Sequence, residues 1–331
     1  MSGQPLRWGI LGTAKIAVNS VIPGIKSSKS GTVAAIASRD GEKAKQKAEQ
    51  LGIPKAYGSY EALLADPDID AVYIPLPNHL HMPWTIKAAE AGKHVLCEKP
   101  IALNAAEAER MEQACRDAGV VLAEAFMYRH HPRYKRIREI VQSGEIGDIR
   151  GIHGTFTFNN SADKTNIRCK VEWGGGSVYD VGCYPISAAR YVLGQEPVAA
   201  TAHAFFSEEH GGVDMMASGL VEFEGGVALT FDCGMWAASR NTLEIVGTIG
   251  RIEVPSAFVA PPGKGNFVVI TKEGRREEAV PDINQYSAQA DAFAAAVRGE
   301  PQPFPPSDAV RNMRVIDAVL RSARERIRVE L

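Results

Sequence analysis

The sequence has few cysteines, almost no net charge and no long apolar run. Its 331 residues include five cysteines, Cys97, Cys115, Cys169, Cys183 and Cys233, and no two of them form a Cys-x-x-Cys pair. This odd and scattered set favours reduced thiols in a cytoplasmic protein over a disulfide framework. A net charge of −2 argues against nucleic acid or a membrane surface as the main partner. No run approaches the roughly 18 apolar residues of a membrane span, and no basic segment with a following apolar run opens the chain.

The sequence also lacks internal repeats, low-complexity linkers and any recognised spacing of metal ligands. The candidate ligands His79, His81, His130 and His131 match no known pattern, so we expect no metal. The length is about twice that of a typical domain, and two domains are therefore the default expectation.

Short apolar runs and amphipathic segments alternate through the first 125 residues. The apolar runs are typical of buried parallel strands and lie at residues 6–12, 32–37, 71–74, 95–97 and 120–123. Helical periodicity follows the first run as far as residue 27 and recurs at residues 42–50, 59–64, 82–91 and 105–118. This alternation predicts a doubly wound parallel sheet of the Rossmann type, in which ligands bind at the carboxyl ends of the strands.

The first strand leads into a sequence that suits a phosphate-binding turn. Gly12 and Ala17 fill the first and third places of Gly-x-Gly-x-x-Gly/Ala, while Ala14 replaces the middle glycine. The backbone of such a turn passes close to a pyrophosphate, whose charge lies at the helix N-terminus. The extra methyl group of Ala14 is expected to shift the pyrophosphate or the loop slightly. The predicted contacts with a dinucleotide come from Gly12, Thr13, Ala14, Lys15 and Ile16.

The second strand ends in Ser38 and Arg39, which favours NADP over NAD. An NAD site usually has an acidic residue here that accepts from the ribose 2′-hydroxyl, whereas a 2′-phosphate needs donors and positive charge. Arg39 can bind that phosphate through two N–H groups, and the Ser38 hydroxyl can donate another bond. The alternative is NAD, with Arg39 on the surface and Asp40 bound to the ribose.

Two more strand ends place polar residues on the cofactor side of the sheet. The loop after residues 71–74 provides Leu76, Pro77, Asn78 and His81 as candidate cofactor contacts. For His81, a buried or helix-capping histidine is an equally good interpretation. The strand at 95–97 delivers Glu98 and Lys99 to its carboxyl end, where both can meet a bound cofactor. The alternative is a solvated lysine at an ordinary turn, and the Lys99–Pro100 bond is a candidate for a cis peptide.

Alternating apolar and polar residues in the second half predict a mostly antiparallel sheet. The strands are expected at residues 149–158, 199–206, 217–223, 227–233 and 242–246, and helices at 133–143, 287–298 and 307–328. One wetter face of this sheet is a candidate interface, so we expect a homodimer or homotetramer. The predicted domains are an NAD(P)-binding Rossmann domain at 1–125 and an α+β domain for substrate binding and oligomerisation at 126–331. The C-terminal helices can pack back on the first domain.

A run of three glycines at 174–176 precedes a predicted helix that bears Asp180 and Tyr184. The i, i+4 spacing places both side chains on one helix face. The glycines permit close approach of a substrate or movement of the loop. The alternative is a glycine-rich turn followed by a core tyrosine.

Taken in order, these motifs resemble the glucose-fructose oxidoreductase, inositol dehydrogenase and rhizopine catabolism (Gfo/Idh/MocA) superfamily. The resemblance rests on residues 9–12, 37–39, 60–64, 70–74, 91–100 and 174–176, and on Asn78, His81, Asp180, Gly182 and Tyr184. It implies hydride transfer between NAD(P) and a secondary alcohol or hemiacetal carbon of a sugar, cyclic polyol or diol. It also implies that Lys99 is a catalytic and cofactor-positioning residue. With tyrosine at position 184, the chain resembles the branch that contains dimeric dihydrodiol dehydrogenases and NADP-dependent D-xylose and D-glucose dehydrogenases. Inositol dehydrogenases have histidine at the matching position.

The implied chemistry requires a base, because the hydroxyl proton must leave as hydride moves to the nicotinamide. A free tyrosine has a pKa of about 10, and a nearby ammonium group favours its phenolate. We therefore hypothesise that Tyr184 exchanges the proton, while Lys99 lowers the pKa of Tyr184, anchors the nicotinamide ribose and polarises the reacting oxygen. The opposite assignment, with Lys99 as the base, stays open. Asp180, Arg129 and Arg168 are expected to bind substrate hydroxyls.

The most specific expectation is an aldose 1-dehydrogenase of the D-xylose or D-glucose type. The alternatives are a trans-dihydrodiol dehydrogenase or a keto-sugar reductase and, in another class, a non-catalytic NADP-binding regulatory protein. A regulatory protein would have no reason to keep both Lys99 and Tyr184.

Overall fold

The computed structural model describes residues 4–331, and the chain divides into two compact units. Unit 1 combines the described part of Met1–His130 with Asn284–Val310. Unit 2 combines His131–Ile283 with Arg311–Leu331. The predicted domain ranges of 1–125 and 126–331 stay predictions.

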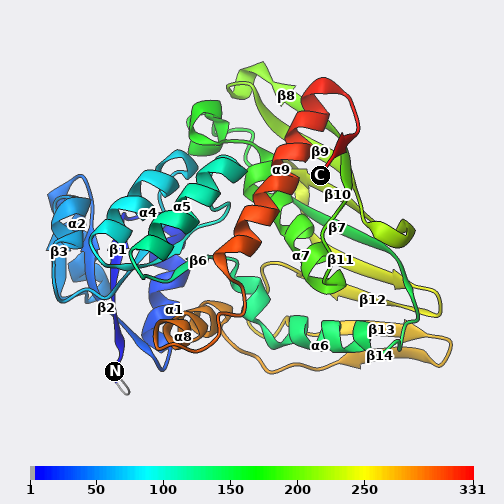
Figure 1. The fold of residues 1–331 in the computed structure, drawn as a ribbon, viewed down its shortest axis with the longest axis horizontal. Helices are drawn as coiled ribbons and strands as arrows, with labels where there is room; N and C mark the ends of the chain where they lie inside the picture. The colour runs from blue at the N-terminus through cyan, green and yellow to red at the C-terminus, as the bar shows by residue number, and fades with distance from the viewer. Residues whose placement is uncertain (1–3) are drawn as a thin grey trace. The chain divides into compact units, whose positions relative to one another are not determined.

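Unit 1 is built around a six-stranded parallel sheet with the strand order β3-β2-β1-β4-β5-β6 (Figure 1). The strands are β1 (Leu6–Leu11), β2 (Gly31–Ala37), β3 (Lys55–Tyr57), β4 (Ala71–Ile74), β5 (His94–Cys97) and β6 (Leu122–Glu124). The strand order reverses between β1 and β4, and dinucleotides bind at such a reversal, at the carboxyl ends of the strands. The predicted doubly wound parallel sheet is confirmed.

Helices cover both faces of this sheet. On one face α1 (Ile22–Ser27) and α8 (Gln285–Val297) lie together, and the rings of Trp8 and Phe293 pack with centroids 4.9 Å apart. The helix α2 (Gly41–Leu51) contributes Ala48 to the same apolar cluster. On the other face, a Cβ at Gly9 would come within 2.5 Å of a Leu63 methyl group from α3 (Tyr60–Leu64). Figure 1 shows α4 (His81–Glu90) and α5 (Ala105–Asp117) away from α1 and α8.

Unit 2 contains a nine-stranded sheet with the order β14-β13-β12-β11-β7-β10-β9-β8-β15. The strands β7 and β10 pair in parallel and the other neighbouring strands are antiparallel. The bounds are β7 (Ile149–Asn159), β8 (Ala199–Ser207), β9 (Val213–Glu222), β10 (Ala228–Gly234), β11 (Trp236–Gly247), β12 (Gly250–Pro255), β13 (Phe267–Thr271), β14 (Gly274–Glu278) and β15 (Val329–Glu330). The prediction of a large, mostly antiparallel sheet is confirmed.

One face of the large sheet is covered by helices. A Cβ at Gly154 of β7 would lie 2.5 Å from the Pro185 side chain of α7 (Cys183–Leu193), which places this helix directly on the sheet. The helix α6 (Pro132–Gln142) packs beside α7, with the rings of Tyr134 and Tyr191 6.4 Å apart. The last helix, α9 (Pro306–Glu325), starts in the part assigned to unit 1 and continues in unit 2. The opposite face of the sheet carries exposed side chains.

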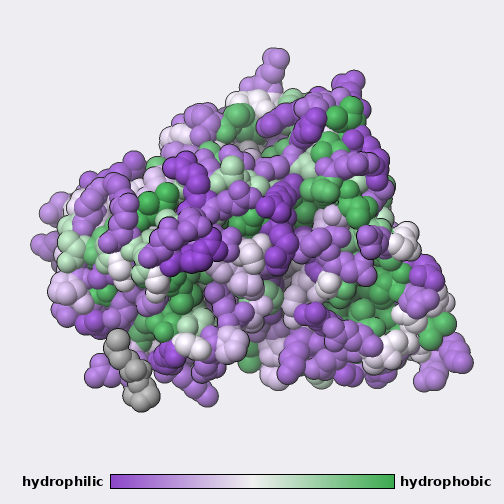
Figure 2. Space-filling model, viewed as in Figure 1, coloured by the Kyte–Doolittle hydropathy of each residue, from purple (hydrophilic) through white to green (hydrophobic). Residues whose placement is uncertain are grey.

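All five cysteine side chains are buried and not joined in disulfides. Within residues 4–331, none of the helices combines the length and apolar character needed to span a bilayer. The face of the protein in Figure 2 is mostly hydrophilic.

Candidate active site

The turn after β1 has the backbone that a phosphate-binding loop needs. Gly12 has a φ of +119°, and a Cβ at this position would lie 3.2 Å from the Leu76 side chain. The Gly12 N–H donates to the carbonyl of Ala37 at 2.9 Å, which ties the turn to the end of β2. Lys15 is exposed, and Thr13, Ala14 and Ile16 are half-buried. The predicted helix begins with a π turn, Ala17–Val21, before α1.

At the end of β2, Asp40 and Arg39 have different roles. The Asp40 carboxylate accepts from the Lys43 N–H at 3.1 Å and so caps α2, while Arg39 is exposed. The Ser38 hydroxyl is buried and accepts from the Asp40 N–H at 3.2 Å. Burial raises the pKa of the Tyr60 phenol, and the positive charge of the nearby Arg39 guanidinium lowers that pKa in part. Tyr60 therefore belongs beside the predicted 2′-phosphate residues, although sequence reasoning gave it no role.

His81 braces the loop after β4 against the residues after β5. Its ring nitrogens lie 2.7 Å from the Leu76 carbonyl oxygen and 2.9 Å from that of Pro100, and the side chain is fully buried. Burial lowers the pKa of this imidazole to about 4, so the ring is neutral at pH 7. A neutral ring has one N–H and donates to one of the two carbonyls while it contacts the other. This arrangement matches the buried alternative for His81. Leu76 is nearly buried, and Pro77 and Asn78 are half-buried.

The strand β5 delivers Glu98 and Lys99 to its carboxyl end. The Glu98 N–H donates to the Ile74 carbonyl at 3.1 Å, and its carboxylate accepts from the Tyr73 hydroxyl. The same carboxylate accepts from the Lys99 N–H at 3.3 Å. Lys99 is half-buried, and the Lys99–Pro100 peptide is cis. Glu98 thus fixes the backbone from which the Lys99 side chain extends.

In unit 2 the chain brings Arg168, Asp180 and Tyr184 together. Arg168 Nε donates to Asp180 Oδ2 at 2.6 Å. The pKa of the Arg168 guanidinium is raised by the Asp180 carboxylate and also by the Tyr184 phenol. Tyr184 is 4% exposed and lies in the first turn of α7, directly after a π turn at Val178–Gly182 that contains Asp180.

The three glycines before this π turn permit close approach of the protein's own chain. A Cβ at Gly175 would lie 2.4 Å from the carbonyl oxygen of Arg168, and one at Gly176, where φ is +122°, would lie 2.1 Å from Asp214 Oδ1. Asp214 Oδ2 accepts from the Ser177 hydroxyl at 2.8 Å and from the Val178 N–H at 2.7 Å. Burial raises the pKa of Asp214 to about 6. Sequence reasoning missed Asp214, whose signal is an acidic residue within an otherwise apolar stretch of β9.

Arg129 has a different environment, in unit 1. Its side chain is buried, forms a salt bridge with Asp308 and lies over the rings of Phe126 and Phe304 at 4.8 and 5.0 Å. These contacts give Arg129 a structural role in unit 1. Its predicted contact with substrate stays a prediction.

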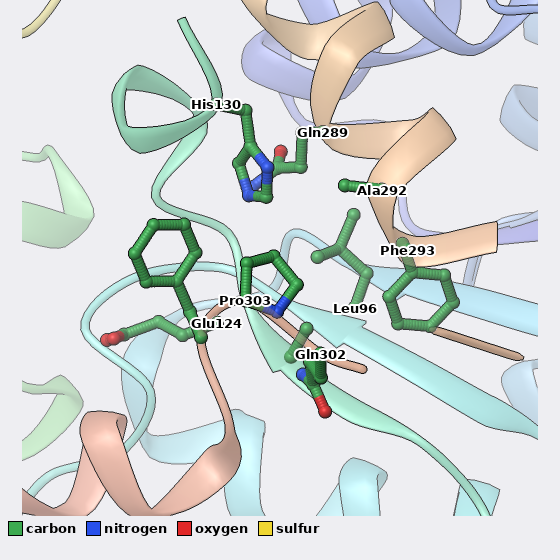
Figure 3. A pocket seen from close by; sticks show the side chains of 10 residues that line it. Leu96, Glu124, His130, Gln289, Ala292, Phe293, Gln302 and Pro303 are labelled. Atoms are coloured by element: carbon green, nitrogen blue, oxygen red, sulfur yellow. The ribbon is translucent and has the colours of Figure 1, made fainter. Parts of the chain in front are cut away.

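A small recess in unit 1, with a volume of about 20 Å³, lies between α8 and the ends of β5 and β6. Figure 3 shows the side chains that line it, with Gln289, Ala292 and Phe293 contributed by α8. The recess is lined by Leu96, Ala123, Glu124, His130, Gln289, Ala292, Phe293, Gln302, Pro303 and Phe304. It contains none of the predicted cofactor residues, so it is distinct from the predicted dinucleotide site. Among residues 4–331, no group of three or more histidine, cysteine, aspartate or glutamate side chains is arranged to hold a metal ion.

Comparison with known proteins identifies the two halves of the chain separately. Residues 6–126 match the family model described as an oxidoreductase family with an NAD-binding Rossmann fold. Residues 134–253 match the model of the GFO/IDH/MocA C-terminal domain.

Three similar proteins act on sugars or diols. A D-xylose 1-dehydrogenase (NADP(+)) from Haloferax volcanii is 42% identical over 98% of this chain and 100% of its own length. A trans-1,2-dihydrobenzene-1,2-diol dehydrogenase from Xenopus laevis is 36% identical over 77% of each chain. The crystal structure of a 3-ketoreductase from Actinomadura kijaniata, in complex with NADP and TDP-benzene, is 33% identical. It has a TM-score of 0.91 and covers 96% of this chain and 98% of its own.

Proposed function

This chain belongs to the GFO/IDH/MocA oxidoreductase family, as its motifs predict, and we propose that it is an NADP-dependent aldose 1-dehydrogenase of the D-xylose or D-glucose type. The observation that carries the proposal is the delivery of Lys99 to the carboxyl end of β5. In the order 3-2-1-4-5-6, this strand lies two places from β1, which ends at the glycine turn. The long match with a D-xylose dehydrogenase supports the choice of substrate.

The choice of NADP follows from the end of β2. Arg39 is exposed and its charge acts on the Tyr60 phenol, and these two groups offer positive charge and a hydroxyl to a 2′-phosphate. Asp40 caps α2 with the carboxylate that would have to accept from the ribose of NAD. At Gly12, an added Cβ would lie in tight contact with Leu76, 3.2 Å away, in the turn where a pyrophosphate must approach the backbone. The residues present therefore fit NADP, with Gly12 to Ile16 at the pyrophosphate.

Bound NADP supplies the hydride acceptor at its nicotinamide. The protein must then remove the hydroxyl proton, and we assign this step to the Tyr184 phenolate, which becomes the neutral phenol as it accepts the proton. The Lys99 ammonium favours the phenolate and polarises the reacting oxygen. We expect Arg168 and Asp180, which share a hydrogen bond near Tyr184, to bind neighbouring hydroxyls of the substrate. The pairing of Lys99 with Tyr184 rests on the family resemblance.

The test follows the absorbance of reduced nicotinamide with NADP+ and a panel of aldoses, cyclic polyols and a trans-dihydrodiol. We expect oxidation of D-xylose or D-glucose, and a loss of about 100-fold or more in kcat for both Lys99→Ala and Tyr184→Phe. Tyr191→Phe, on the same helix α7, is the control for Tyr184→Phe. Activity that survives both substitutions would contradict the catalytic roles assigned to Lys99 and Tyr184. Activity with the dihydrodiol alone would show that the substrate is a dihydrodiol and not an aldose.

A keto-sugar reductase is the second candidate, because the 3-ketoreductase structure aligns over 96% of this chain. Solved structures of that reductase also include variants in which one lysine or one tyrosine is replaced. The same panel is therefore repeated with NADPH and keto sugars. Faster reduction than any aldose oxidation would favour this function.

We also propose that the protein is a cytoplasmic homodimer or homotetramer joined through the large sheet. Five buried thiols without disulfides are consistent with a reducing compartment. The sheet face opposite α7 carries the exposed apolar residues Phe205 and Leu220, and a second copy of the chain is the proposed cover.

A further inference from the structure

Arg133, near the start of α6, is a fully buried arginine that binds backbone rather than a carboxylate. Its Nη2 donates to the Ser256 carbonyl at 2.8 Å and also to the Ala257 carbonyl. Within the part of the chain that the structure describes, its Nε and Nη1 are buried without a hydrogen-bond partner. A buried charge without a paired anion is costly, so such a residue is expected only where its contacts matter.

The segment that Arg133 holds is the start of the loop 256–266, between β12 and β13. Ser256 has a φ of +50°, in the left-handed region that a residue with a side chain rarely adopts. Tyr134, the next residue of α6, donates its hydroxyl to the Ala257 carbonyl at 3.0 Å. From the other side, Asn241 of β11 accepts from the Phe258 N–H at 2.8 Å and donates to the Val259 carbonyl at 2.8 Å. Three side chains therefore fix the backbone around Phe258.

Phe258, whose backbone is held in this way, packs against the Tyr184 ring. The two ring centroids are 5.5 Å apart, and Phe156 of β7 completes a cluster of three rings. The Phe156 ring lies 5.2 Å from Tyr184 and 5.5 Å from Phe258. Phe258 is fully buried, so it acts on Tyr184 and not on a ligand in solvent. A tyrosine ring has two free torsions, and packing against two aromatic neighbours restricts both.

We propose that Arg133 is a positioning residue for proton exchange at Tyr184. It holds residues 256–257 in place, and this contact seats Phe258 against the Tyr184 ring. The inference rests on the proposed function, because it gives Arg133 a part in the reaction assigned to Tyr184. A displacement of about 1 Å in a reacting group is enough to cost about 100-fold in rate, so a constraint of this kind affects catalysis.

The first experiment compares Arg133→Lys with Arg138→Lys. Arg138 lies on the same helix and is half-buried, and its guanidinium lies 5.3 Å from the centre of the Tyr191 ring, so it serves as the control. We expect Arg133→Lys to lower kcat about tenfold and to leave KM for NADP+ within about twofold, because cofactor contacts are predicted in unit 1. Arg138→Lys should leave both constants unchanged. An equal loss in both variants would overturn the proposal.

A double variant tests whether Arg133 acts through Phe258. Once Phe258→Leu has removed the aromatic contact, Arg133→Lys should lower kcat little further, because the two residues act in series. Fully additive effects on kcat would contradict the proposal. If Arg133→Lys fails to fold, Asn241→Ala loosens the same segment from β11 and should give the same kinetic pattern.

A measurement without substrate separates this inference from the proposed function. The protein has nine tyrosines, and labelling with 3-fluorotyrosine gives a fluorine resonance for each, with Tyr184 assigned through Tyr184→Phe. We expect the Tyr184 resonance to shift or broaden in Arg133→Lys and to stay unchanged in Arg138→Lys. An unchanged resonance in Arg133→Lys overturns the positioning role. If the wild-type protein oxidises no member of the substrate panel, the proposed aldose dehydrogenase function is overturned instead, whatever the Tyr184 resonance shows.

Discussion

Cofactor choice depends on one exposed side chain, Arg39. We expect Arg39→Ala to raise KM for NADP+ about 10- to 100-fold, because a charge-assisted hydrogen bond is worth about 1.5–3 kcal/mol. KM for NAD+ should change little, since NAD+ lacks the 2′-phosphate. The measurement is initial rate against each cofactor. Lys47→Ala removes a half-buried positively charged side chain from α2, where Lys47 bonds only its neighbour Gln50 in the described contacts, and should leave both values unchanged. Equal weakening of both cofactors would assign Arg39 another role.

His81 links the fold's stability to pH. The pKa of this imidazole is about 4 in the folded protein, compared with 6.5 for a free histidine, because burial disfavours the charged ring. As the pH falls from 6.5 to 4, the unfolded state binds the proton first, and the folded state loses about 3 kcal/mol at this position. Burial lowers the pKa of His130 and His131 to about 4 as well, so their effects have the same sign.

We expect the free energy of unfolding to decrease between pH 6.5 and 4, as measured by urea unfolding at several pH values. His81→Gln should be less stable at pH 7, because the brace between Leu76 and Pro100 is altered. It should also lose about 3 kcal/mol less than wild type over the same pH range. His153→Gln, at an exposed position of β7, is the control and should follow the wild-type curve. Parallel curves for His81→Gln and wild type would show that this imidazole does not titrate differently on unfolding.

Residues with a motif or charge signal could be placed in the fold from sequence, whereas the contacts of residues that act through packing could not. Lys99 and Arg39 follow apolar strands directly, so their position at a sheet edge was predictable. Arg133 and Asn241 meet residues 256–259 only through the tertiary fold, and no local pattern indicates that contact. Asp214 of β9 likewise accepts hydrogen bonds from Ser177 and Val178 only because the tertiary fold brings β9 to the π turn, and no local pattern indicates these contacts.

At the scale of elements, two helices that follow predicted binding loops begin in the same unusual way. A π turn at Ala17–Val21 precedes α1, and another at Val178–Gly182 precedes α7. Single π turns inside helices are frequent at functional sites. Apolar periodicity predicted both helices, but a spacing of 3.6 residues carries no signal for one widened turn.

Gly176 provides a test of how tightly the second π turn is held. We expect Gly176→Ala to destabilise unit 2 by about 2–4 kcal/mol, through a left-handed φ and a collision with the buried Asp214 carboxylate. Gly144 also has a positive φ, +75°, but no atom lies within 4 Å of an added Cβ, so Gly144→Ala should cost only about 1 kcal/mol. Urea unfolding measures both, and kcat should fall only in Gly176→Ala. Equal costs would mean that the Asp214 contact contributes nothing.

Elements with a clear apolar pattern were predicted well, whereas β3 and β14 were not predicted. The predicted strand at 149–158 corresponds to β7 (Ile149–Asn159), and the predicted helix at 105–118 to α5 (Ala105–Asp117). In contrast, β3 has three residues, which is too short for an alternating pattern. The edge strand β14 has the sequence Gly-Arg-Arg-Glu-Glu and is almost entirely exposed. Such charged residues protect a sheet edge, and they also remove the apolar signal of a strand.

At the scale of the whole molecule, one face of the large sheet lacks a cover within the described chain. Register places Phe205 of β8 and Leu220 of β9 on the face opposite α7, and they are 47% and 37% exposed. Trp236, which is 43% exposed, packs on Phe205 with ring centroids 4.8 Å apart. Large exposed aromatic groups on a flat sheet are typical of a protein interface.

We therefore expect the protein to sediment as a dimer or tetramer at micromolar concentration, and Phe205→Glu to shift it towards the monomer. A glutamate at this position would bury an unpaired charge at the centre of a symmetric contact, where each copy presents the same surface. Ile249→Glu is the matched control, because Ile249 is 59% exposed but lies outside the strands, between β11 and β12. Sedimentation velocity measures all three proteins. A monomeric wild type would contradict the proposed oligomer. Equal dissociation of both variants would show that the interface is not centred on Phe205.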